Sequence, residues 1–161
     1  MDNVYAAIEP GAQRTQQISG LYVQMIDAAV YTDQTAALTD RNSSTTASWA
    51  TVGTGDAIYI GANEPFHAIY FEQDTPRTAN VAIALNYSTG SGTWAAITTP
   101  PDGTMLFNQD GLIGIFDVGA VSDLRSLATP WTTDSVNGVT RYWVRVTTVG
   151  NMTGVVMREV Y

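Results

Sequence analysis

The feature that most restricts the fold is an alternation of large apolar with small or polar side chains in TANVAIALNYS, residues 78–88. A two-residue period is that of an extended strand with one buried face. The residues on the apolar side are Ala79, Val81, Ile83, Leu85 and Tyr87. The turn-forming residues STGSG (88–92) follow, and TWAAIT (93–98) continues as a second apolar segment. This order predicts a β-hairpin.

Similar short apolar segments recur along the chain, separated by clusters of Gly, Pro, Asn and Asp. They are residues 21–31, 57–61, 66–72, 104–107, 111–118, 141–148 and 154–161. Short strands at this spacing predict an all-β fold, an antiparallel β-sandwich of jelly-roll type. The helical pattern that stands out is SDLRSLA (122–128), which we expect to form a short connector helix.

A length of 161 residues suits one sandwich domain, which we place at residues 20–161. Residues 1–19 are expected to form an N-terminal arm, extended or loosely held. Within it, residues 10–19 have no periodicity, so they either order on a neighbouring subunit or form a solvated loop. Residues 39–48 read as a polar loop.

The charge balance disfavours several classes of partner. Acidic residues number 15 against 7 basic ones, all of which are arginine, and the net charge is −8. Such a chain repels phosphate backbones, so no direct binding of nucleic acid is expected. No apolar segment is long enough to span a membrane, and the first residues lack the pattern of a signal peptide. We therefore expect no membrane partner.

Candidate catalytic residues are few. Cysteine is absent, which removes thiol nucleophiles and zinc-thiolate sites, and His67 is the single histidine. Phe66 and Phe71 beside it indicate a strand border rather than a catalytic triad. The carboxylates lie mostly in turns, including NQDG (108–111), although their number alone leaves a glycosidase open. The sequence predicts no catalytic residue, no cofactor and no metal, and hence not an enzyme.

The segment GVTRYWVRVTT (138–148) supplies a candidate interaction surface. Read with period two, it directs Tyr142 and two valines to the core and the intervening residues Arg141, Trp143 and Arg145 to the other face. Guanidinium stems beside Trp143 can cover the ring, which makes this face either a covered outer sheet or a contact with the next subunit. The residues of this candidate surface, with those of the arm, are Arg141, Trp143, Arg145, Arg14, Gln16 and Gln17.

The order of several segments resembles a sandwich domain found in structural proteins of tailed bacteriophages. These segments are residues 57–98, PDGT (101–104), FNQDGLIGIFDV (107–118), PW (130–131) and VNGVTRYWVRVTT (136–148). The residues that match the marked positions of that domain are Trp94, Tyr142, Trp143 and Arg145. In the resemblance these positions maintain the fold and have no catalytic role. The chain departs from the pattern by an insertion at 119–129 and by its own first 50 residues.

The resemblance implies a virion component, made in the host cytoplasm. Its location would be the capsid surface, favoured over the tail, as a decoration protein that stabilises the outer shell. A tail or baseplate accessory protein is the alternative within the same class. The expected partners are the major capsid protein or other virion proteins, and the chain itself as a homo-oligomer, with a trimer favoured. The number of Trp and Tyr residues on a sandwich scaffold also fits a different class of protein, a carbohydrate-binding module, which stays open as an alternative.

Overall fold

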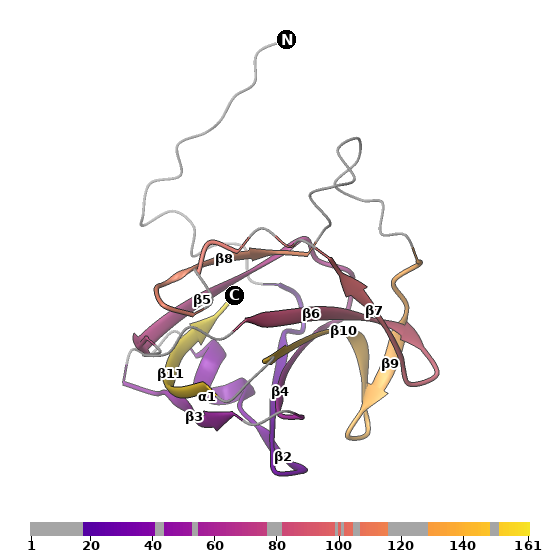
Figure 1. Ribbon diagram of the computed structural model, residues 1–161. Helices are drawn as coiled ribbons and strands as arrows, with labels where there is room; N and C mark the ends of the chain where they lie inside the picture. Colours follow the sequence, from indigo (N-terminus) through magenta and orange to yellow (C-terminus); the bar gives the residue numbers. More distant parts are fainter. Residues whose placement is uncertain are drawn as a thin grey trace.

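Two antiparallel sheets make up the fold in the computed structural model, which describes residues 18–40, 44–52, 55–76, 82–98, 100, 102–104, 107–115, 129–148 and 152–161. The elements are β1 (Tyr22–Asp27), β2 (Val30–Asp33), α1 (Thr35–Thr39), β3 (Ala47–Val52), β4 (Ala57–Ala62), β5 (Ala68–Thr75), β6 (Ile83–Gly90), β7 (Thr93–Ile97), β8 (Gly111–Gly114), β9 (Thr133–Val136), β10 (Val139–Thr148) and β11 (Met152–Val160). The large sheet has seven strands in the order β2-β1-β4-β10-β6-β7, with β9 paired to β10, and the small sheet has four in the order β3-β11-β5-β8. Figure 1 shows the arrangement.

The chain crosses between the sheets at almost every connection. Strands β1, β4, β6 and β10 belong to the large sheet, and the strands that alternate with them, β3, β5, β8 and β11, belong to the small one. The remaining strands β2, β7 and β9 are hairpin partners of β1, β6 and β10 in the large sheet. This alternation between two packed antiparallel sheets confirms the predicted all-β sandwich of jelly-roll type.

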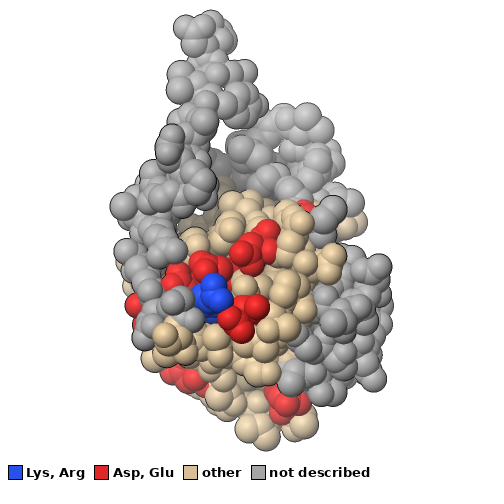
Figure 2. All heavy atoms as spheres, turned by 90° about the vertical axis from the view of Figure 1, so that its left-hand side faces the viewer, with Lys and Arg blue, Asp and Glu red and all other residues tan. Residues whose placement is uncertain are grey.

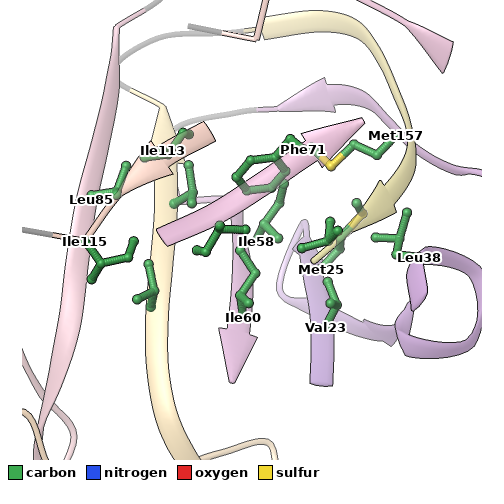
Figure 3. Packing of buried hydrophobic residues seen from close by; sticks show 14 of the residues in the cluster. Val23, Met25, Leu38, Ile58, Ile60, Phe71, Leu85, Ile113, Ile115 and Met157 are labelled. Carbon is green, nitrogen blue, oxygen red and sulfur yellow. The ribbon is translucent and has the colours of Figure 1, made fainter. Parts of the chain in front are cut away.

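The core lies between the sheets, where apolar residues of both inner faces meet. Val23 and Ile60 of the large sheet point toward Phe71, Ile113 and Met157 of the small one (Figure 3). Each of these side chains is buried, and full burial of an aliphatic or phenylalanine side chain contributes about 1.5–3 kcal/mol. The alternation in the sequence therefore reflects the two faces of each strand.

The predicted hairpin is confirmed by the pairing of β6 with β7, and residues 78–81 of its predicted first strand lie outside the described residues. Leu85 and Tyr87 are buried on its inner face, as the alternation requires. The turn between the strands includes Ser91 and Gly92, both with positive φ (55° and 75°).

The prediction of one strand over residues 21–31 is wrong. The segment divides into β1 and β2 at a two-residue turn formed by Ala28 and Ala29, whose φ angles are 48° and 68°. The backbone N–H of Ala28 donates to a carboxylate oxygen of Asp56 at 3.0 Å, which helps to hold this turn. A long-range hydrogen bond thus stabilises a bend that the local sequence does not indicate.

Two other predicted segments also differ from the structure, and a third lies outside the described residues. Thr104 and Phe107 of the predicted strand 104–107 lie in turns. The polar loop predicted at 39–48 overlaps α1 at one end and β3 at the other. The short helix in the described part is α1, which buries Leu38, whereas the segment 122–128 lies outside the described residues.

No helix in the ranges given above is long and apolar enough to cross a membrane.

Candidate functional site

The outer face of the large sheet, which points away from the core, carries a row of polar and aromatic residues. Strand register aligns Gln24 of β1 with Tyr59 of β4, Tyr59 with Arg145 of β10, and Arg145 with Asn86 of β6. Residues next to them in each strand, such as Val144, belong to the core, so the row faces outward. The sheet therefore brings together side chains from four strands that are distant in sequence.

Trp143 is completely buried within this outer layer. Tyr22 and Tyr59 contact its ring edge to face at centroid distances of 6.1 and 6.4 Å. Its indole Nε1 donates a hydrogen bond to the backbone oxygen of Asp134 at 3.0 Å. The ring is thus shielded by its own chain and not by a neighbouring subunit, and it is a structural residue of the face.

An arginine does stack on an indole here, but the ring is Trp94. The guanidinium carbon of Arg145 lies 4.7 Å from the centroid of the Trp94 ring, a cation–π geometry. Trp94 in turn contacts Tyr59 at 5.7 Å, and Tyr59 contacts Tyr31 at 5.9 Å. We call Tyr31, Tyr59, Trp94 and Arg145, together with Asn86, the aromatic–arginine cluster. Tyr31 is 37% exposed, so the cluster reaches solvent.

The arginines on the two outer faces differ in their partners. Arg158, on the small sheet, pairs with Glu72 at 3.3 Å and with Asp74 at 2.6 Å. Figure 2 shows a basic group enclosed by acidic side chains on this side of the molecule. Arg141 and Arg145, in contrast, form no ion pair with any carboxylate among the described residues. Arg145 thus has no carboxylate partner in the part of the chain that the structure describes, whereas Asp134 lies opposite Arg141 in the register of β9 and β10, and Asp33 lies opposite Gln24 in that of β1 and β2.

Burial and hydrogen bonding raise the pKa of Tyr22 and of Tyr31 in the outer layer. Burial raises the pKa of Tyr31, with further contributions from Tyr59 beside it, and Arg145 opposes the shift. The hydrogen bond from Tyr22 to Asp33, at 2.8 Å, raises the pKa of Tyr22. These phenols are therefore hydrogen-bond donors at neutral pH.

The small sheet carries a pair of stacked tyrosines on its side of the molecule. The rings of Tyr70 and Tyr161 are 5.1 Å apart and nearly parallel, and the two backbones exchange hydrogen bonds. Burial and the neighbouring carboxylate of Glu72 raise the pKa of Tyr161 to about 12. The hydroxyl of Tyr161 donates to Glu72, so this pair extends the network around Arg158.

The candidate catalytic residues that fall within the described part of the chain occupy structural positions. His67 is exposed, and its backbone oxygen accepts a hydrogen bond from Ile115. A carboxylate oxygen of Asp102 accepts from the backbone of Thr104 two residues on, as expected for a turn residue, and one of Asp110 accepts from the backbone of the distant Gln73 in β5. The described ranges contain no group of three or more His, Asp or Glu residues that could hold a metal ion.

The structure brings together only part of the predicted interaction surface. Arg141, Trp143 and Arg145 share the outer face, whereas Arg14, Gln16 and Gln17 lie outside the described residues. Sequence reasoning did not select Tyr31, Tyr59 or Trp94 as neighbours of Arg145. The period-two pattern of each strand is a signal for their orientation, but strand order and register decide that they meet.

Comparison with known proteins assigns no family to the chain. No family model matches the chain, and no curated protein matches it. Among solved structures, a similar one is described as a pectin-binding carbohydrate-binding module, with a TM-score of 0.39 and 13% sequence identity over 91% of each chain. The proposal of a function therefore depends on the residues of this chain.

Proposed function

We propose that this chain is a non-enzymatic structural protein of a tailed bacteriophage, which binds the outer shell of the capsid as a decoration protein. The observation that supports the proposal is that residues of separate segments in the phage-domain resemblance contact one another. Arg145 stacks on Trp94, and Tyr142 contacts Trp131 of the PW segment edge to face at 6.2 Å. The hairpin, the PW segment and the last large-sheet strand are thus joined by residues of the segments that the resemblance singles out.

The proposed mechanism is bridging of a lattice. A decoration protein makes many modest contacts that symmetry repeats over the shell, so their sum stabilises the particle even where each is weak. In this proposal the partners are the major capsid protein and further copies of the chain, with a trimer favoured. The alternative position within the particle is the tail or baseplate.

Immunogold labelling of purified particles tests the location. An antibody against the folded domain should decorate the head surface of intact particles. Label confined to the tail would move the protein to the tail or baseplate class. Absence of label from particles that contain the protein by immunoblot would place it inside the shell and reject decoration.

A carbohydrate-binding module is a second candidate, favoured by one specific observation. The half-buried ring of Trp94 and the exposed ring of Tyr31 lie on the same outer face, beside polar groups of Asn86 and Arg145. Aromatic rings next to hydrogen-bonding side chains form the usual surface for a sugar ring. The informative substitution is Trp94→Ala rather than Trp143→Ala, because Trp143 is buried. A glycan array on which the wild-type chain binds nothing would exclude this candidate.

A further inference from the structure

We propose that the aromatic–arginine cluster is a binding site for a saccharide that bears a carboxylate group. This inference rests on the carbohydrate-binding candidate and specifies the class of its ligand. Two features carry it: Arg145 forms no ion pair among the described residues, and its guanidinium group stacks on Trp94.

The environment of Arg145 favours an anionic ligand. Arg145 forms no ion pair with a carboxylate in the part of the chain that the structure describes, although the chain carries more than twice as many acidic as basic residues. Its Nε atom is buried without a hydrogen-bond partner among these residues. A partly desolvated guanidinium gains most from an anionic acceptor, since charge-assisted hydrogen bonds are about twice as strong as neutral ones.

The geometry suits a carboxylate attached to a ring. Stacking on Trp94 holds the guanidinium plane of Arg145, and its Nη2 lies 3.4 Å from the amide oxygen of Asn86, a long and weak contact. A planar guanidinium can bind a carboxylate through two parallel hydrogen bonds. The exposed ring of Tyr31 then offers an apolar surface for the C–H groups of the sugar beside it.

The neutral polar groups of the outer row favour a saccharide over an acidic peptide. Arg145 and Tyr59 lie in strands with neighbours on both sides, and Tyr31 and Trp94 lie in the edge strands β2 and β7, so the cluster extends across the sheet. The row also includes Gln24, which is 1% exposed and whose Oε1 has no partner among the described residues. Neutral amides beside a cation match the mixture of hydroxyl and carboxylate groups on an acidic sugar.

Titration calorimetry on the full chain with matched ligands tests the inference. The pairs are sialyllactose with lactose, and a glucuronic-acid oligosaccharide with its carboxyl-reduced form. We expect at least one carboxylated member to bind at least tenfold more tightly than its neutral counterpart. Its affinity should fall as salt rises, because the contact is between opposite charges.

Variants locate the site. Arg145→Gln and Trp94→Ala should each weaken binding at least tenfold, and Arg145→Lys should weaken it less than Arg145→Gln because the charge remains. Arg158→Gln, on the other sheet, is the matched control and should bind as wild type. Melting temperatures and near-ultraviolet circular dichroism verify that each variant is folded. Folded Arg145→Gln and Trp94→Ala proteins with unchanged affinity would overturn the site.

The outcomes separate this inference from the function on which it rests. Equal binding of charged and neutral sugars would overturn the carboxylate specificity and leave carbohydrate binding standing. Binding of neither class would overturn both. Binding of a polyglutamate peptide as tightly as the sugars would overturn the assignment to a saccharide.

Discussion

The indole ring of Trp143 occupies the space in which a β-carbon of residue 61 would lie, and residue 61 is glycine. A β-carbon at position 61 would come within 2.6 Å of the Cε3 and Cζ3 atoms of that ring. The two residues face each other across β10 and β4, and Trp143 is completely buried there. The missing side chain of Gly61 is therefore what lets a large ring fill the outer layer of the sheet.

This contact predicts that Gly61→Ala destabilises the domain. Overpacking of this kind costs about 1–3 kcal/mol of unfolding free energy, because the ring or the strand must move. Urea denaturation measures the loss. The double variant Gly61→Ala/Trp143→Phe should lose less than the sum of the single losses, since a smaller ring leaves room for the methyl group. Strict additivity would contradict the contact.

Trp143 itself should behave as a core residue. Trp143→Ala should lower the unfolding free energy by about 3–5 kcal/mol, as for other buried tryptophans. Trp143→Phe should cost less, since only part of the ring and the hydrogen bond to Asp134 are lost. A Trp143→Ala protein as stable as wild type would mean that the ring is not packed as described.

Ionisation of the Tyr161 phenol at alkaline pH should lower the free energy of unfolding of the domain. The pKa of Tyr161 in the folded state, about 12, lies above the ordinary tyrosine value of 10.0 because of burial and nearby Glu72. A raised pKa favours the protonated phenol in the folded state, so this contribution is complete below pH 10 and is lost as pH rises toward 12. Urea unfolding at pH 9 and 11 should show a smaller loss for Tyr161→Phe than for wild type. An identical loss in both proteins would contradict the assignment.

Truncation of the predicted N-terminal arm should distinguish a role of the arm in self-association from a role in the thermal stability of the domain. Ile18 packs against the core, and the backbone oxygen of Ser19 accepts a hydrogen bond from Asn63. Deletion of residues 1–17 should therefore leave the melting temperature of the isolated domain nearly unchanged and weaken self-association, if the arm contacts a neighbour. Deletion of residues 1–20 should lower the melting temperature. Analytical ultracentrifugation and thermal melts measure the two effects, and a large fall in melting temperature for the shorter deletion would make the arm part of the domain.

The hairpin of β6 and β7 could be predicted because the alternation of apolar with small or polar residues and the residues of the turn both indicate a hairpin. The turn at Ala28–Ala29 could not, since alanine is not a turn residue and the bend depends on the distant Asp56. Asn137–Gly138, with φ angles of 48° and 81°, joins β9 to β10. An Asn-Gly pair is a known hairpin signal, so this turn was accessible from the sequence.

The candidate site was predictable only in part. The period of two places Arg145 and Trp143 on the same face of β10, which the structure also has. The partner of Arg145 comes from β7 and the aromatic neighbour of that partner from β4. Local patterns do not encode which strands become neighbours or in which register, and so the stacking of Arg145 on Trp94 emerges only from the assembled sheet.

Density-gradient sedimentation of a phage lysate in which this chain is produced tests the central proposal most directly. Mass spectrometry of the fractions should find the protein with intact DNA-filled particles, at a stoichiometry comparable to that of a repeated shell component. The protein should remain with them through a second gradient. Recovery of the chain only at the top of the gradient, as a free protein absent from particles, would contradict its assignment as a structural protein of the virion.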